Sequence, residues 1–218
     1  MKRRYVSVMT IAVFALGTVF VSCKKDKTNN NNLTATQVND IPADTIIGIY
    51  TSGPATGQPY GSGKFTFFSL ERNEVVAHAD SATTKWDLAF RGTTILTNGG
   101  TSGPASGGAF VYVGTFDGLS SVPADSVFRT DNAPTYAIKT GSGNGWYSYN
   151  GATQLITPIP GRILVIRTAS GKYAKVEIMN YYKGGVTPDA SASDNDKLSK
   201  QRYYTFRYTF QSNGSMNF

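Results

Sequence analysis

The sequence predicts an all-β protein, a single domain of short antiparallel strands arranged as a sandwich or a flattened barrel. The first observation is composition: 13 Tyr, 12 Phe and 23 Gly among 218 residues are typical of strands and turns. The second is a series of short apolar or alternating runs, separated by turns rich in Gly, Pro and Ser. The third is that no stretch sustains the apolar period of 3.6 residues that a packed helix requires. Together these observations favour β structure throughout the folded part.

The N-terminus has the pattern of a lipoprotein export signal. Three basic residues at positions 2–4 precede an apolar run over residues 6–21, which is too short for a confident membrane span. Cys23, the only cysteine, follows the small residue Ser22. We therefore expect residues 1–22 to be a signal peptide and Cys23 to carry a lipid anchor. The alternative is an ordinary export signal in which Cys23 is incidental.

The domain organisation follows from this signal. Residues 28–32 are Thr followed by four Asn, a low-complexity sequence that buries nothing. We expect residues 23–44 to be the lipidated cysteine with a polar tether, and residues 45–218 to be the β domain. A mature chain of this length can form one domain with a substantial core.

The positive charge of the chain belongs mainly to the segment before the domain. The whole sequence has a net charge of +7, but from residue 33 onward it holds 15 basic and 13 acidic residues. The folded part is therefore close to neutral, and we expect no nucleic-acid partner. A single cysteine also excludes an internal disulfide and a site of several thiolates.

Several β-rich runs are predicted in the first half of the domain. Residues 85–91 (KWDLAFR) show the alternation, with Trp86, Leu88 and Phe90 expected on one strand face and Asp87 on the other. The further runs are residues 45–50, 64–70, 109–116 and, after a hairpin turn, the last residues of 71–77.

The second half predicts longer strands. Residues 162–168 (RILVIRT) are nearly all apolar, which indicates a strand buried on both faces. A tight turn at Ser170-Gly171 leads into residues 172–182, where Lys175, Glu177 and Met179 are expected on the outward face. Residues 202–210 put four aromatic residues on one face and leave the other face wet, whereas the polar residues 187–201 are expected to form a mobile surface loop.

The sequence offers little for catalysis, and we expect no enzyme. His78 is the only histidine, no Gly-x-Ser-x-Gly motif occurs, and sites built from several histidines are impossible. A pair of carboxylates for glycoside hydrolysis would have to come from residues expected mostly in turns or on outward faces. These residues are Glu71, Glu74, Asp87 and Glu177. Aromatic side chains are abundant instead, and they can form core, a pocket for a flat ligand, or a shallow sugar-binding face.

Several segments in order resemble the HmuY family of haem-binding lipoproteins from Bacteroidetes. The resemblance covers roughly residues 64–210, besides the cysteine with its polar linker. The matching pieces are residues 67–69 (FFS), 74–76 (EVV), 85–91 (KWDLAFR), 101–103 (TSG), 107–110 (GGAF), 122–125 (VPAD), 145–146 (GW), 162–167 (RILVIR), 170–176 (SGKYAKV) and 205–210 (TFRYTF).

This resemblance implies an all-β protein that takes up haem on the cell surface and hands it to an outer-membrane transporter. It implies haem or another porphyrin as the ligand, and attachment to the outer membrane through the lipid alone. In the family's best-known mode, two side chains clamp the haem iron. One comes from between the Val-Pro and Gly-Trp motifs, and the other from just after Gly-Trp.

The corresponding segments of this chain hold few iron ligands. Residues 125–144 contain no His, Met or Cys, and Asn150 stands near the second expected position although Asn ligates iron poorly. The remaining candidates are Tyr149 first, then Tyr147, and Tyr136. Because Tyr147 and Tyr149 are two residues apart on one strand, we expect that both line the pocket or that neither does.

A second class of function stays open. The same fold without haem ligation would be a surface module that recognises a glycan or a protein. A slot with Tyr149 at its edge favours haem, whereas an exposed aromatic ledge without a cleft favours a glycan. Two close carboxylates in a groove would favour an enzyme acting on carbohydrate.

Overall fold

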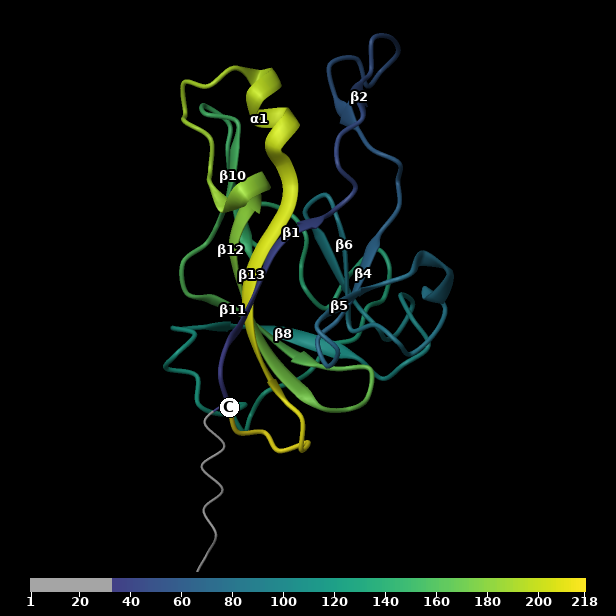
Figure 1. Cartoon of the computed structure of the whole chain (residues 1–218), viewed down its shortest axis with the longest axis vertical. Helices are drawn as coiled ribbons and strands as arrows, with labels where there is room; N and C mark the ends of the chain where they lie inside the picture. Colours follow the sequence, from purple (N-terminus) through teal and green to yellow (C-terminus); the bar gives the residue numbers. More distant parts are fainter. Residues whose placement is uncertain (1–32) are drawn as a thin grey trace, which may run out of the picture. The chain divides into compact units, whose positions relative to one another are not determined.

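Two antiparallel sheets face each other in the folded part of the chain (Figure 1). The computed structural model describes residues 33–218, so the predicted signal peptide and Cys23, the predicted lipidation site, lie outside the described residues. The all-β prediction is confirmed, because strands connected by turns and loops make up the domain. Among residues 33–218, no helix is long and apolar enough to cross a membrane.

The larger sheet has five strands in the order β1-β13-β12-β11-β8. Its central strands β12 and β13 pair over most of their length, and β1 and β8 form its edges. The bounds are β1 (Thr36–Pro42), β8 (Gly108–Val113), β11 (Arg162–Arg167), β12 (Tyr173–Tyr182) and β13 (Gln201–Gln211).

The smaller sheet has four strands in the order β5-β4-β6-β7, and two separate hairpins accompany the sheets. The strands of this sheet are β4 (Thr66–Ser69), β5 (Glu74–Val76), β6 (Leu88–Arg91) and β7 (Thr94–Thr97). The hairpins are β2 (Gly48–Ile49) with β3 (Pro59–Tyr60), and β9 (Tyr147–Asn150) with β10 (Leu155–Pro158). Short helices are η1 (His78–Asp80), η2 (Lys183–Gly185) and α1 (Asp194–Lys200).

The main core lies between the two sheets. Phe68 and Phe90 of the small sheet pack against Phe206 of the large one, with ring centroids 5.5 and 5.7 Å apart. Tyr204 and Tyr208 of β13 lie in the same core, as the alternation of residues 202–210 predicts. This face carries most of the apolar burial that stabilises the domain.

The outer face of the large sheet is partly covered. Thr205 and Thr209 of β13 are buried, so the expectation of a wet face is wrong at these positions, whereas Met179 of β12 is exposed as expected. Loop residues Phe116 and Leu119 pack on Ile163 and Val165 of β11, which confirms that this strand is buried on both faces. Lys175 points to this same face but is only 6 % exposed. Its Nζ donates to the carbonyl oxygens of Phe116 and Leu119 at 2.7 and 2.8 Å, and desolvation lowers its pKa.

The strand predicted over residues 85–91 begins later than expected. Trp86 is fully buried, but it packs against Phe67 in a cluster on the outer face of the small sheet, whereas Leu88 and Phe90 face the main core. Because β6 starts at Leu88, strand alternation does not apply to Trp86 and Asp87. Asp87 is therefore buried rather than exposed.

Two predicted boundaries differ from the structure. The tether expected over residues 23–44 is too long, because residues 36–42 form β1 and pair with β13, where Val38 and Ile41 enter the core. The loop expected over residues 187–201 contains α1, whose first turn is capped by Ser193 Oγ accepting from Asp196 N–H at 3.2 Å. A helix of seven residues is too short to give a sustained apolar period.

Candidate functional site

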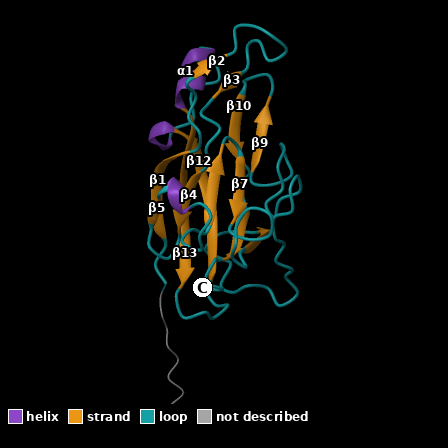
Figure 2. Ribbon diagram, turned by 90° about the vertical axis from the view of Figure 1, so that its right-hand side faces the viewer, coloured by secondary structure: helices purple, strands orange, loops and turns teal. Residues whose placement is uncertain are grey.

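A cavity of about 770 Å³ lies beside the β9–β10 hairpin. Most of the lining comes from the β2–β3 hairpin, the β6–β7 connection, the β9–β10 hairpin, and α1 with the start of β13. Asp44, Gly63 and Tyr181 of β12 complete it. These hairpins and α1 lie at the same end of the sandwich in both views (Figure 1, Figure 2). The cavity is therefore assembled from segments that are far apart in the sequence.

The β6–β7 turn supplies one wall and is held in place by the core. Gly92 adopts a φ of 52°, which lets a two-residue turn join the strands. Tyr204 Oη donates to the Gly92 carbonyl at 2.9 Å, and Trp146 Nε1 donates to the Thr93 carbonyl at 3.0 Å. The Gly92 N–H in turn donates to the Ala43 carbonyl at 2.8 Å. The turn that presents Arg91, Thr93 and Thr94 is thus fixed from three sides.

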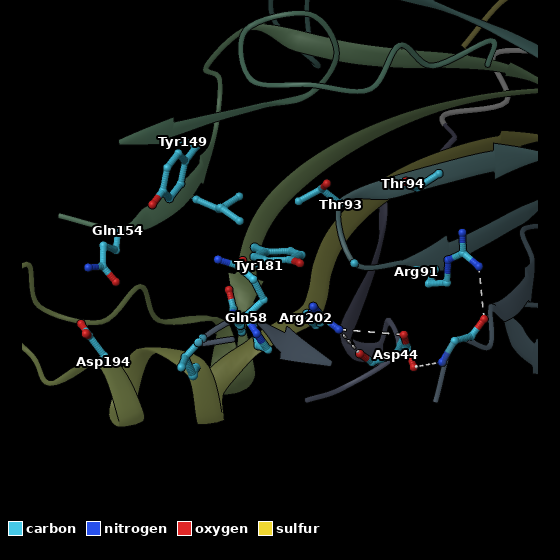
Figure 3. A pocket seen from close by; sticks show the side chains of 17 residues that line it. Asp44, Gln58, Arg91, Thr93, Thr94, Tyr149, Gln154, Tyr181, Asp194 and Arg202 are labelled. Atoms are coloured by element: carbon cyan, nitrogen blue, oxygen red, sulfur yellow. Dashed lines mark hydrogen bonds and ion pairs between the residues drawn. The ribbon is translucent and has the colours of Figure 1, made fainter. Parts of the chain in front are cut away.

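Arg202 and Asp44 meet at the same cavity in an unusual backbone conformation. Both have positive φ values, 70° and 59°, which non-glycine residues adopt at a cost. Arg202 Nη1 donates to the Asp44 carbonyl at 2.9 Å and lies 3.9 Å from its carboxylate (Figure 3). Asp44 Oδ1 also accepts from Ser62 Oγ and the Gly63 N–H, each at 2.9 Å. The Asp44 carboxylate is occupied by these contacts, and it orients Arg202.

Tyr149 and Gln154 stand on the opposite side of the cavity in Figure 3. Tyr149 is 50 % exposed, and its strand is tied down by its own N–H, which donates to Ser142 Oγ at 2.8 Å. Ile156, its partner on β10, has an N–H that donates to Tyr182 Oη at 2.9 Å. A half-exposed phenol ring is thus presented at the rim on a fixed hairpin.

Of the four residues predicted for the site, Tyr149 alone lines this cavity. Tyr147 is 8 % exposed and packs on Trp146 in the main core, so the two tyrosines are separated although they share a strand face. The hairpin runs from the core to the surface, and burial falls along β9 from Tyr147 through Ser148 to Tyr149. Asn150 Oδ1 accepts from the N–H groups of Ala152 and Thr153, which closes the hairpin turn. Its side chain serves the turn rather than the cavity.

Tyr136 belongs to another part of the domain. It packs against the cluster of Phe67, Trp86 and Leu96 on the outer face of the small sheet. None of residues 125–144, the segment expected to hold the first iron ligand, lines the large cavity. The structure therefore does not bring Tyr136 and Tyr149 to one site.

Several cavity residues were missed by the sequence reading. Tyr181 is buried beside its neighbour Tyr182 because β12 has irregular register between Ile178 and Tyr182, and such an irregularity is not visible in the sequence. Burial also raises the pKa of Tyr181. Arg91 lies at the end of β6 and Arg202 near the start of β13, positions where charged residues carry no distinctive signal.

The carboxylates considered for catalysis do not pair with each other. Glu71 contacts Lys172, Glu74 contacts Arg72, and Glu177 contacts Arg207. Asp87 accepts from two backbone N–H groups instead. Within residues 33–218, no three His, Cys, Asp or Glu side chains are grouped so that they could hold a metal ion. The site offers positioned polar and aromatic groups, which suit binding.

Three solved structures resemble this chain at low identity. A protein described as a lipoprotein from Bacteroides fragilis NCTC 9343 shares 17% identity with a TM-score of 0.49, covering 83% of this chain and 91% of its own. An HmuY-like haem-binding protein from Bacteroides vulgatus ATCC 8482 shares 15% with a TM-score of 0.44, covering 66% and 84%. The apo HmuY analog of Tannerella forsythia shares 14% with a TM-score of 0.40, covering 82% and 95%.

A comparison with models of protein families assigns the chain to a family. No curated protein matches the sequence. The family model described as HmuY protein, however, matches residues 62–208, which is more than half of the chain and runs from the β3–β4 connection into β13. The resemblance read from the ordered segments of the sequence is thereby confirmed, and this chain belongs to the HmuY family.

Proposed function

We propose that this chain binds haem, or another flat porphyrin, in the cavity beside the β9–β10 hairpin and supports haem uptake at the cell surface. The observation that carries the proposal is the half-exposed Tyr149 at the rim of a cavity of about 770 Å³, in a member of the HmuY family. This volume lies within the range of about 300–1,000 Å³ that is usual for sites that bury small ligands. The cavity therefore suits a ligand of porphyrin size.

The apolar groups of the cavity fit a flat ring. Tyr149, Ile156 and Tyr181 lie on the side of the β9–β10 hairpin and β12, and Leu198 of α1 and Pro59 of β3 also line it. A porphyrin buries a large apolar area, so these walls would supply much of the affinity. Iron ligation would add selectivity rather than most of the binding free energy.

Tyr149 is the group best suited to ligate the iron. No His, Met or Cys is among the described residues that line the cavity. Tyrosinate is a known haem ligand, and the Tyr149 ring is accessible from the cavity. Tyr181 is less suited, because it is almost fully buried, and this burial raises its pKa and so disfavours the tyrosinate form that ligates iron. We therefore expect a high-spin ferric site with at most one phenolate, weaker than a site with two ligands.

Two arginines would receive the carboxylates of haem. Arg91 and Arg202 both line the cavity, from the β6–β7 turn and from β13. Arg91 Nη1 donates to the Gly63 carbonyl at 3.2 Å, and its guanidinium lies 4.3 Å from the centre of the Phe65 ring. Guanidinium groups bind carboxylates with charge-assisted hydrogen bonds, so both can hold a propionate.

The cellular setting is part of the same proposal. A lipid on Cys23 would hold the protein at the outer membrane, exposed at the cell surface, without a membrane-spanning segment. An outer-membrane haem transporter would be the partner that receives the ligand. A binding role without catalysis accords with family membership and with carboxylates that are each engaged by separate partners.

The polar part of the cavity lining favours one alternative. Gln58, Thr94 and Gln154 line the cavity together with the exposed ring of Tyr149, and such a set also suits a glycan. In that case the chain would be a surface binding module that has lost haem ligation. An array of soluble oligosaccharides would then give saturable binding, and ferric haem would give none.

The experiment that tests the haem site compares two tyrosine variants. Ferric haem is added to the wild type, to Tyr149→Phe and to Tyr147→Phe, and the absorption spectra are recorded. We expect Tyr149→Phe to lose the phenolate charge-transfer band, because its hydroxyl is at the rim. Tyr147→Phe removes a hydroxyl from the core and should keep the band. An unchanged band in Tyr149→Phe would mean that another residue ligates the iron.

A further inference from the structure

A second, smaller cavity has a different character from the first. It has a volume of about 320 Å³ and lies between β8, the start of β11 and the segment over residues 127–144. It shares no lining residue with the large cavity. It therefore needs an explanation separate from the proposed haem site.

Three cationic side chains line this cavity and no acidic one does. They are Arg129, Lys139 and Arg162, which come from three separate parts of the chain. None of the three takes part in an ion pair within residues 33–218, and none donates a side-chain hydrogen bond there. Like charges gathered at one cavity repel each other unless an anion neutralises them.

The backbone fixes the three cations at this place. Arg129 forms an isolated bridge with Ala109 of β8, through two hydrogen bonds of 2.9 and 3.0 Å between their N–H and carbonyl groups. Arg162 opens β11 and pairs with Val113 of β8. Lys139 follows the buried Ile138, and its carbonyl lies so close to Gly145 that a side chain there would collide with it. The convergence is thus part of the fold.

The remaining lining is apolar and indicates the kind of anion. Val111 and Ala137, which also belong to the main core, form apolar walls, and Val127 is 72 % exposed beside them. Phe110 points to the other face of β8, where its ring packs on Phe128. An apolar surface next to cations suits a molecule with an apolar body and an anionic group. We propose that this cavity binds a small organic anion, a phosphate monoester or a carboxylate, with its apolar part against Val111 and Val127 and its charge on Arg129, Lys139 and Arg162.

The test uses the mature chain in detergent and two probes of matched shape. Phenyl phosphate and phenylacetate are titrated by calorimetry and by 1H–15N spectra, with benzyl alcohol as the neutral control and inorganic phosphate as the control without an apolar body. The variant Arg129→Gln/Lys139→Gln/Arg162→Gln removes the cations. A matched variant, Lys64→Gln/Lys85→Gln/Lys183→Gln, removes the same charge from exposed positions outside this cavity.

We expect saturable binding of at least one aromatic anion, with shifts centred on residues 108–111, 127–129 and 137–144. The cavity variant should bind it at least about tenfold more weakly, which is the loss of one to two charge-assisted hydrogen bonds. The matched variant should bind like the wild type. The relative affinity of the two probes distinguishes a phosphate site from a carboxylate site.

Three results would overturn the proposal: no saturable binding of either anion, equal binding by both variants, or equally tight binding of benzyl alcohol. Stronger binding of inorganic phosphate than of phenyl phosphate would contradict the assigned role of the apolar walls. Thermal unfolding of each variant shows whether it is folded, and the exposed positions of Arg129 and Lys139 make this the expected case. Because haem is absent from this test, its result does not depend on the proposed haem site.

Discussion

At the scale of single residues, Asp87 links the two sheets. It lies just before β6, and its two carboxylate oxygens accept from the Leu70 N–H at 2.8 Å and from the Ala169 N–H at 2.9 Å. Leu70 follows β4 of the small sheet, whereas Ala169 lies in the β11–β12 turn of the large one. One carboxylate thereby satisfies backbone donors from both sheets, and this explains why an acidic residue is buried in this position.

Removing this carboxylate should destabilise the domain. Asp87→Ala leaves the buried Leu70 N–H and the part-buried Ala169 N–H without an acceptor. We expect it to lower the free energy of unfolding by about 2 kcal/mol or more. Urea unfolding followed by circular dichroism measures this loss. A change below about 0.5 kcal/mol would show that water or a rearranged loop replaces the carboxylate.

The same residue gives a pH dependence with a definite sign. Burial raises the pKa of Asp87 above its usual value of 3.8, so the folded state binds the proton more tightly than the unfolded state. The stability that the folded state gains from this tighter proton binding is therefore complete below about pH 3.8. It is lost as the pH rises through the folded-state pKa. Relative to Asp87→Asn, the wild type should lose stability over that rise. A gain in stability over the same pH range would mean that the hydrogen bonds to Asp87 lower its pKa by more than burial raises it.

At the scale of elements, two arginines reach the large cavity from different strands. Arg91 ends β6, and Arg202 stands near the start of β13 with a positive φ. Asp44 holds Arg202 through its carbonyl, so the guanidinium retains further donors for a ligand. Elements that are distant in the sequence thus place two cations at one site.

These cations should determine the preference for a ligand with free carboxylates. Arg91→Gln and Arg202→Gln are each expected to weaken haem binding about tenfold, the effect of one charge-assisted hydrogen bond. Haem dimethyl ester should bind the wild type correspondingly more weakly. Lys183→Gln, a cation outside the cavity, is the control. Equal affinities for haem and its ester would show that the carboxylates face solvent.

The elements also show what the sequence could predict and what it could not. Residues 162–167 and 202–210 were recognised because their patterns reflect burial directly. The boundary errors at β1, β6 and α1 arose where an edge strand is polar, where a strand starts late, or where a helix is only seven residues long. Tyr149 was placed by its distance from Gly-Trp, but its separation from Tyr147 depends on where the hairpin leaves the core. The cavity arginines depend on tertiary contacts that no local pattern records.

At the scale of the whole molecule, side chains cover much of the outer face of each sheet. The cavities formed by the loops and hairpins are therefore the places where a ligand can bind. Loops over residues 116–122 cover the large sheet, and the Trp86 cluster covers the small one. The cavity of about 770 Å³ is lined by the hairpins and α1, at one end of the sheets. The sandwich therefore acts as the scaffold, and the hairpins form the proposed haem site.

The proposed attachment of the molecule to a membrane depends on the sulfur atom of Cys23. Cys23→Ala removes the only thiol that could receive a lipid, and we expect this variant to leave the membrane fraction and appear in the soluble fraction. Detergent fractionation of cells that produce either form measures the change. Continued membrane association of Cys23→Ala would show that another feature anchors the chain.

The most direct test of the central claim is a titration of the wild-type mature chain with ferric haem, followed by absorption and by quenching of Trp146 and Trp86 fluorescence. The account predicts saturable binding of one haem per chain at about micromolar concentration, with a high-spin ferric spectrum. An unsaturated, linear increase in absorption through that range, with no shift of the haem spectrum, would contradict the haem site and favour a glycan or protein ligand.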